Sequence, residues 1–104
     1  MNICKSLLAL VLLCQTLPVI AAPFSAERKA ELSTMLVEDC GACHGLNLNG
    51  GLGPSLLRSD LLGKPRELLV AAILNGRPGT AMPPWHPLMT HKEAEWLLDQ
   101  LLAE

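Results

Sequence analysis

Apolar side chains recur at helical spacing in three stretches of the chain and predict three main helices. These helices are expected at about residues 26–39, 65–74 and 90–103. Charged residues of the first stretch, including Arg28, alternate with its apolar positions and are expected to face largely outward. The residues expected to face inward are Leu32, Met35, Leu36 and Val37 in the first helix, Leu68, Leu69, Ala72 and Ile73 in the second, and Trp96, Leu97, Leu101, Ala94 and Leu98 in the third.

Residues with capping preferences mark the ends of these helices. Ser25 can cap the first helix, and Pro65 suits the first position of the second, which should stop at Asn75-Gly76. Thr90-His91-Lys92-Glu93 has the capping-box pattern at the start of the third. Ser59 can cap a short additional turn through Leu62. We assign no chemistry to the second helix, which is expected to be scaffold.

The first residues of the chain have the pattern of a secretory signal peptide. Lys5 precedes an apolar run at residues 7–13, and small residues follow it. This run is too short to span a bilayer. We expect cleavage after Ala21, so that residues 1–21 are a signal peptide and residues 22–104 form one small exported domain. An uncleaved N-terminal anchor is the alternative.

Cleavage would also change the cysteine count and the charge. Cys4 and Cys14 would leave with the leader, and a lipoprotein signal at Cys14 is disfavoured because a leucine precedes it. Only Cys40 and Cys43 would then remain, with no pair left for a structural disulfide. The eight basic residues less Lys5, against ten acidic ones, leave a formal charge of −3. No basic run is present, which argues against a nucleic-acid partner.

The strongest chemical signal is the run Cys40-Gly41-Ala42-Cys43-His44. Two cysteines separated by two residues and followed by histidine form the attachment motif of c-type haem, in which the thiols bond to the haem vinyl groups. His44 can then bind the iron from the proximal side. A thioredoxin-like pair would need a strand–helix context, and a zinc site would need a second ligand pair at suitable spacing. The sequence offers neither, so it predicts one covalent haem c.

A proline-rich loop at residues 77–85 supplies a candidate for the sixth iron ligand. Met82 lies in this loop, and a His/Met ligand pair raises the reduction potential of haem. Pro83 and Pro84 restrict the backbone beside it, and Trp85 is expected to form a wall of the haem pocket. A core position for Met82 is the plain alternative. Competing ligands are His86 above all, then Met89 and His91.

The loop between the haem motif and the second helix is rich in glycine and asparagine. Residues 45–53 could approach a porphyrin closely, because glycine lacks a Cβ, or could form an ordinary surface loop. Pro54 follows, and its carbonyl could accept the proton on Nδ1 of His44, which leaves Nε2 for iron. A simple turn role for Pro54 is the alternative.

Together these residues resemble the class I cytochromes c over essentially the whole of residues 22–104. The resemblance implies an all-α fold in which N- and C-terminal helices cross around a covalent haem. It assigns the haem attachment to Cys40 and Cys43, iron ligation to His44 and Met82, and orientation of His44 to Pro54. The glycine and aromatic residue that often serve the helix crossing are missing from the first helix, so Trp96 is expected to supply the aromatic from the other helix.

A narrower resemblance is to the small periplasmic monohaem cytochromes of the NirC type, which accompany cytochrome cd-type nitrite reductase in denitrification. Cys40-Gly41-Ala42-Cys43-His44-Gly45, the run from Gly50 to Pro54 and the run from Gly76 to Trp85 carry it. It implies a monomeric, periplasmic single-electron carrier, not an enzyme and without stable membrane insertion. Its partner would be nitrite reductase or an upstream donor, in electron delivery or in maturation of the d-type haem. An open-site haem protein that binds or converts nitric oxide or peroxide is the alternative.

Overall fold

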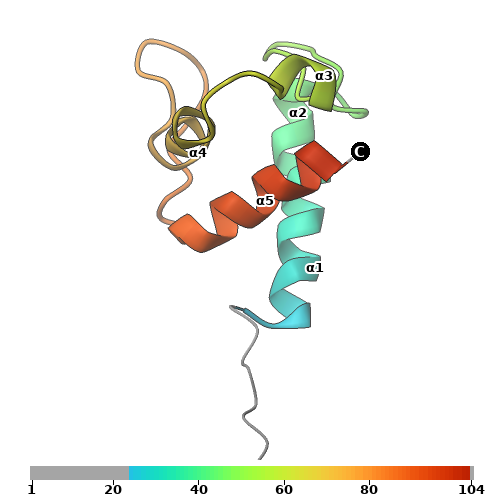
Figure 1. The fold of residues 1–104 in the computed structure, drawn as a ribbon, viewed down its shortest axis with the longest axis vertical. Helices are drawn as coiled ribbons and strands as arrows, with labels where there is room; N and C mark the ends of the chain where they lie inside the picture. The colour runs from blue at the N-terminus through green and yellow to red at the C-terminus, as the bar shows by residue number, and fades with distance from the viewer. Residues whose placement is uncertain (1–23, 104) are drawn as a thin grey trace, which may run out of the picture.

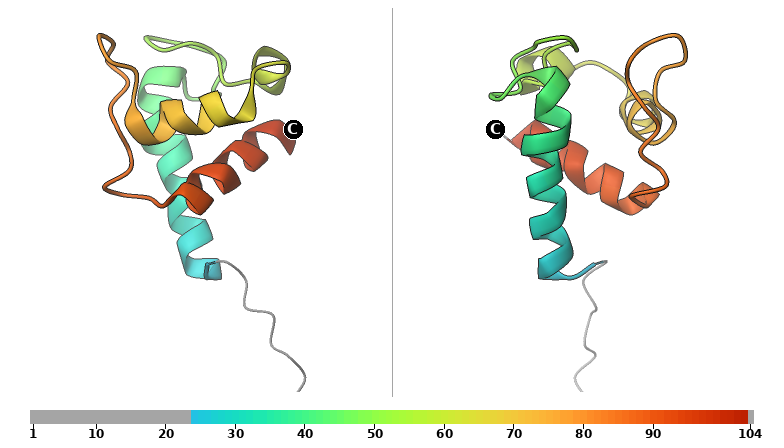
Figure 2. Two further views of the ribbon diagram at one scale, coloured as in Figure 1. Left: turned by 60° about the vertical axis from the view of Figure 1, so that its left-hand side comes forward. Right: turned by 180° about the vertical axis from the view of Figure 1, so that it is seen from behind.

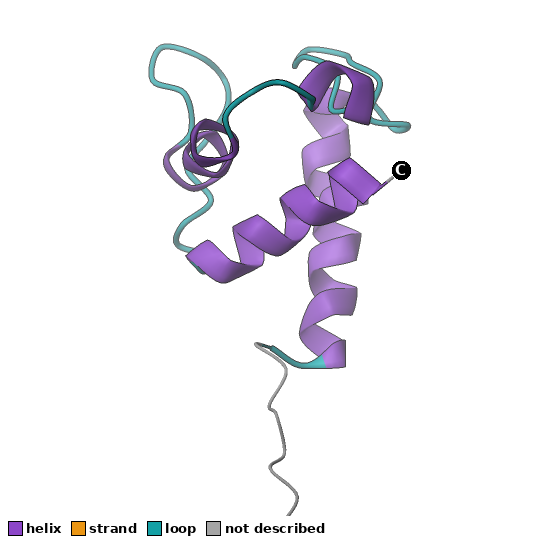
Figure 3. Ribbon diagram, viewed as in Figure 1, coloured by secondary structure: helices purple, strands orange, loops and turns teal. Residues whose placement is uncertain are grey.

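The computed structural model describes residues 24–103 and folds them into helices and loops, with no strand in that range (Figure 3). The predicted signal peptide, residues 1–21, lies outside the described residues. None of the helices between residues 24 and 103 has the length and apolarity needed to cross a membrane. The helices are α1 Ala26–Met35, the π-helix η1 Leu36–Cys40, α2 Gly41–His44, α3 Arg58–Leu61, α4 Arg66–Asn75 and α5 His91–Ala103.

The first helix is longer than predicted and passes through the haem motif. Ser25 caps α1 as predicted, with its Oγ 3.1 Å from the backbone nitrogen of Arg28. The prediction that the helix ends near residue 39 is wrong, because α1, η1 and α2 form one continuous column in Figure 1. The π-turn shows in the hydrogen bond from Gly41 N–H to the carbonyl of Leu36, five residues back. The column ends at Gly45, whose φ of 96° suits glycine.

The N- and C-terminal helices cross, as Figure 1 shows, with α5 passing in front of the α1–α2 column. Leu32 of α1 and Ala94 of α5 have no exposed surface. Trp96 packs edge-on against Phe24, with ring centroids 5.8 Å apart and an interplanar angle of 90°. The second aromatic residue of this pair therefore comes from the segment before α1. The buried core consists of Leu32, Leu61, Val70, Met89, Ala94, Leu97 and Leu98.

Two predicted core positions are wrong. Val37 is 55% exposed and Leu68 is 66% exposed, whereas Val70, which was not predicted, is only 3% exposed. The helix at residues 66–75 packs against α5 through a face that includes Val70 and Leu74, so Leu68 lies away from that face. Ser59 also does not cap a helix, because α3 begins at Arg58 without a side-chain cap.

An ion pair between α1 and α5 corrects the prediction that Arg28 faces outward. Its Nε lies 2.7 Å from Oε1 of Glu93, and its Nη2 lies 3.1 Å from Oε2. Glu93 is only 7% exposed and forms the predicted capping box with Thr90, through bonds of 2.8 and 3.2 Å. The hydrogen bonds from Arg28, and then those from Thr90, hold the pKa of Glu93 below its ordinary value. Nη2 of Arg28 also donates to the carbonyl of Leu88, at 2.6 Å.

Candidate haem site

The two cysteines of the motif lie on the helical column, three residues apart. Cys40 ends η1 and Cys43 lies in α2; both are free thiols and half-buried. Side chains three residues apart share one helix face, so both thiols are on the same side of the column. Burial raises the pKa of the Cys40 thiol, and the charge of Asp39 raises it further.

His44 is buried at the end of α2 with a defined ring orientation. Its exposed fraction is 8%, and Nδ1 lies 2.6 Å from the carbonyl oxygen of Pro54. A carbonyl oxygen only accepts, so the ring proton must be on Nδ1 in this contact. The Nε2 lone pair is then free for a metal, which is the arrangement usual for a metal-binding histidine. The geometry is the one that the predicted roles of His44 and Pro54 require.

The glycine-rich loop folds back onto the end of α2. Gly50 N–H donates to the carbonyl of His44 at 2.7 Å, and Gly53 N–H donates to that of Cys43 at 2.8 Å. These are carbonyls that a helix end leaves without partners. A Cβ on Gly53 would lie 3.0 Å from Cε1 and Nδ1 of the His44 ring. This loop therefore caps the end of the haem-motif helix and packs on the His44 ring.

Met82 lies in the loop after α4, and hydrogen bonds define the backbone around it. Gly76 ends α4 with a φ of 66°, and a Cβ there would lie 2.6 Å from the carbonyl oxygen of Met82. That oxygen accepts a hydrogen bond from Arg77 N–H at 3.2 Å. Trp85 N–H donates to the carbonyl of Ile73 at 3.1 Å, which ties the far end of the loop to α4. Met82 and Trp85 are both half-buried, and Trp85 packs against the core.

The other candidate ligands have different surroundings. Met89 is 5% exposed and belongs to the core cluster. His86 is exposed, with Nδ1 3.2 Å from the carbonyl oxygen of Leu74. His91 is exposed in the first turn of α5, and its Nε2 lies 3.6 Å from Oε1 of Glu95. Met89 is therefore occupied by core packing, while His86 keeps an accessible ring nitrogen.

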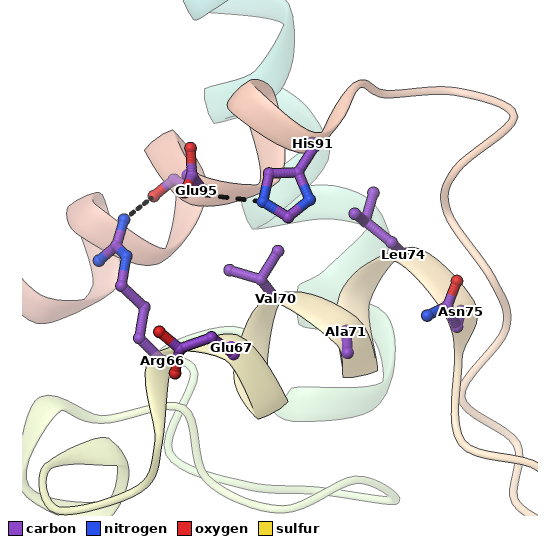
Figure 4. A pocket seen from close by; sticks show the side chains of 8 residues that line it. All are labelled: Arg66, Glu67, Val70, Ala71, Leu74, Asn75, His91 and Glu95. Carbon is purple, nitrogen blue, oxygen red and sulfur yellow. Dashed lines mark hydrogen bonds and ion pairs between the residues drawn. The ribbon is translucent and has the colours of Figure 1, made fainter.

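Two cavities lie away from the predicted ligands. One of about 170 Å³ lies between α4 and α5 (Figure 4), where Glu95 contacts both Arg66 and His91. The other, of about 610 Å³, is lined by residues that include Leu48, Leu56 and Leu101. Neither His44 nor Met82 lines either cavity. Among the described residues, no three His, Cys, Asp or Glu side chains are grouped so as to hold a metal ion.

The donor set nevertheless fits a covalent haem. Two thiols lie on one helix face, an imidazole is held with Nε2 free, and a thioether lies on a loop with a defined backbone. Figures 1 and 2 show that the loop after α2 and the loop after α4 lie at the same end of the molecule. In Figure 1 they are on opposite sides of that end.

Comparison with known proteins identifies the relatives of this chain. Residues 27–99 match a protein-family model described as "Cytochrome C oxidase, cbb3-type, subunit III". The chain is 52% identical over 86 residues to cytochrome c55X of Stutzerimonas stutzeri, a match that covers 83% of this chain and 75% of that protein.

Two solved structures are also similar. One, described as "c-type cytochrome NirC", matches with 54% identity and a TM-score of 0.75, over 77% of this chain and 94% of that chain. The other, described as "Dihydro-heme d1 dehydrogenase NirN in complex with DHE", matches with 31% identity and a TM-score of 0.62. That match covers 67% of this chain but only 15% of the NirN chain, so it is confined to one part of a much longer protein.

Proposed function

This chain belongs to the cytochrome c family, as a small monohaem electron carrier of the NirC type with covalently bound haem c, and on that premise we propose that it passes single electrons between periplasmic proteins of denitrification. The observation that carries the site assignment is the 2.6 Å contact between Nδ1 of His44 and the carbonyl oxygen of Pro54. In the neutral ring this contact fixes the proton on Nδ1 and leaves Nε2 available for iron.

The proximal half of the site comes from one segment. Cys40 and Cys43 provide the two thioether attachments, and His44 provides the proximal ligand. Pro54 fixes the tautomer and the ring plane of His44 through its carbonyl. When bound, haem supplies a single iron that takes up and releases one electron. The chain itself needs no general acid or base for this, and His44 and Met82 would hold the group on its two sides.

The distal half comes from the loop after α4. We assign the sixth position to Met82, whose backbone is held by Arg77 and pressed against Gly76. A thioether opposite a histidine raises the reduction potential relative to two histidines. Trp85 forms a wall of the pocket beside it while also packing on the core.

Absorption spectra of the ferric protein test the distal assignment. Sulfur-ligated ferric haem has a weak long-wavelength band, which we expect in the wild type and in His86→Ala but not in Met82→Ala. The reduction potential of Met82→Ala should fall, since the methionine that raises it is gone. If the band persists in Met82→Ala, Met82 is not the iron ligand. A wild-type protein without the band that readily binds carbon monoxide would instead favour an open site for a small ligand.

For location and partner, we propose export by the leader at residues 1–21, action as a monomer in the periplasm, and electron delivery to cytochrome cd-type nitrite reductase. N-terminal sequencing of protein purified from periplasm should begin at Ala22. Mixing the ferrous protein with oxidised nitrite reductase in a stopped-flow instrument should oxidise it within milliseconds to seconds. No oxidation over minutes would exclude this acceptor.

A second candidate partner is an enzyme of d-type haem maturation. The similarity to part of a dihydro-haem d1 dehydrogenase supports it, because a domain like this chain occurs within that protein. Oxidation of one dihydro-haem d1 releases two electrons and two protons, so two ferric molecules of this chain would each accept one electron. Mixing ferric protein with the substrate-loaded dehydrogenase should then yield two ferrous molecules per substrate. If the dehydrogenase reduces the ferric protein, but the ferrous protein does not react with nitrite reductase, the chain serves in haem maturation.

A further inference from the structure

The segment from Arg77 to Met82 has an unusual combination of exposure and order. Residues 77–81 are all exposed, so no buried side chain of theirs anchors the segment. The backbone nevertheless closes on itself, because Arg77 N–H donates to the carbonyl of Met82 at 3.2 Å. The conformation of such a loop depends on its internal hydrogen bonds and on its proline and glycine residues. Gly79, with a φ of 81°, makes the turn.

One hydroxyl lies inside this loop and bonds to both of its ends. Oγ1 of Thr80 donates to the carbonyl of Arg77 at 2.6 Å and accepts from the N–H of Met82 at 3.3 Å. The N–H of Thr80 reaches the same Arg77 carbonyl at 3.0 Å. The threonine side chain thereby joins the start of the loop to the residue that carries the thioether.

These bonds act on Met82 from both sides of its Cα. Its carbonyl is held by Arg77 N–H and by close contact with Gly76, and its N–H is held by Thr80. A residue fixed at both its N–H and its carbonyl has little freedom in φ and ψ, so the origin of its side chain is fixed as well. Without the hydroxyl the carbonyl contacts would remain, but the N–H would turn to solvent.

We propose that Thr80 is a positioning residue for the Met82 thioether, an inference that rests on the proposed role of Met82 as distal ligand. A thioether is a neutral ligand without charge attraction to iron, so its binding depends on being held at the right place. Thr80 keeps the sulfur in place and slows its exchange for external ligands. It contacts neither the iron nor a redox partner in this role.

Exchange of the distal ligand for imidazole in the ferric holoprotein tests the inference, because imidazole enters only when the sulfur leaves. In Thr80→Val, which keeps the shape but lacks the hydroxyl, we expect imidazole to bind about fivefold to tenfold faster, as loss of one or two net hydrogen bonds implies. Thr80→Ser keeps the hydroxyl and should stay within about twofold of wild type. Amide hydrogen exchange at Met82 should accelerate in Thr80→Val and not in Thr80→Ser.

The outcomes separate this inference from the proposed function. If the wild type shows the sulfur–iron band and Thr80→Val binds imidazole at the wild-type rate, the role of Thr80 is overturned while Met82 remains the ligand. Equal acceleration in the valine and serine variants also overturns it, since the hydroxyl would then be irrelevant. If the wild type lacks the band, both the ligand assignment and this inference fail. If the valine variant does not fold, Thr80→Ala takes its place in the test, because it also lacks the hydroxyl and the position is exposed.

Discussion

At the scale of single residues, a glycine controls how closely the backbone approaches the His44 ring. Gly53 lies against the His44 ring, where a Cβ would be 3.0 Å from two ring atoms, and the next residue, Pro54, accepts the ring hydrogen bond. The close approach and the hydrogen bond therefore depend on each other. A larger residue at position 53 must move either the ring or the Pro54 carbonyl.

Gly53→Ala should consequently disturb the packing around the His44 ring. We expect a loss of about 1–2 kcal/mol in the free energy of unfolding, as for other cases of overpacking, and a changed orientation of the His44 ring. Denaturant unfolding and NMR of the haem-ligand resonances in the ferric protein would measure both.

Gly41→Ala is the matched control, since a Cβ there meets only the Leu36 carbonyl, at 3.8 Å, within a helix. It should stabilise the protein slightly or leave it unchanged. Unfolding curves for Gly53→Ala that coincide with those of Gly41→Ala would show that His44 has room for the extra methyl group.

At the scale of elements, the crossing of α1 and α5 is held by packing and by the partly buried ion pair of Arg28 and Glu93. The pair links residues 65 positions apart, and Arg28 also contacts the carbonyl of Leu88 in the segment between Met82 and α5. Because the same carboxylate completes the capping box of α5, Glu93 joins the start of one helix to the start of the other.

Glu93→Gln should cost about 2 kcal/mol of stability at pH 7, because a charged hydrogen bond in a buried position is lost. Glu31→Gln removes the exposed partner of the same arginine and should cost about 0.5 kcal/mol or less. Urea unfolding of the two variants beside wild type measures the difference. If the two variants lose similar amounts of stability, the ion pair between α1 and α5 is not the source of the stabilisation.

The contribution of Glu93 should also depend on pH in a defined direction. Its pKa is lower in the folded protein than its ordinary value of 4.5, because Arg28 favours the charged form. The unfolded state then binds the proton more readily, so the stabilisation is full above about pH 4.5 and is lost as the pH falls through the folded-state pKa. The difference in the free energy of unfolding between wild type and Glu93→Gln should thus narrow as the pH falls below about 4.5. A difference that widens on acidification would contradict this assignment.

At the scale of the whole molecule, the protein part of the core is small. Seven apolar residues are buried among those at positions 24–103, and few aromatic side chains contribute. A core of this size barely supports a stable domain, so the covalent haem is expected to supply apolar surface that the chain lacks. The fold and its cofactor would then be coupled energetically.

A chain that cannot attach haem should accordingly be poorly folded. The double variant Cys40→Ser with Cys43→Ser should show clearly lower helicity than the holoprotein and no cooperative thermal transition. Far-UV circular dichroism measures both. Full helicity with a sharp transition would show that the seven-residue core is sufficient without haem.

The sequence by itself determined the features that are encoded by residues close together in the chain. The cap at Ser25, the capping box at Thr90 and the covalent haem motif are each encoded within a few positions, and the class I cytochrome c fold and haem c that they indicated are confirmed. The roles of Pro54, Met82 and Trp85 are still predictions of this local pattern. The helix boundaries were less accurate, because the column through η1 contains no residue that marks the π-turn.

Only the tertiary structure decided which distant residues meet. The Arg28–Glu93 pair, the contact of Gly53 with the His44 ring and the burial of Val70 in place of Leu68 depend on how helices rotate and loops fold back. Helical periodicity allows several inward faces when apolar residues are abundant, and a charged residue looks the same in sequence whether it faces water or a buried partner. Contacts across the fold select among these possibilities. In the arrangement observed, the core residues are buried together and no buried side-chain nitrogen or oxygen of the described residues is without a hydrogen-bond partner.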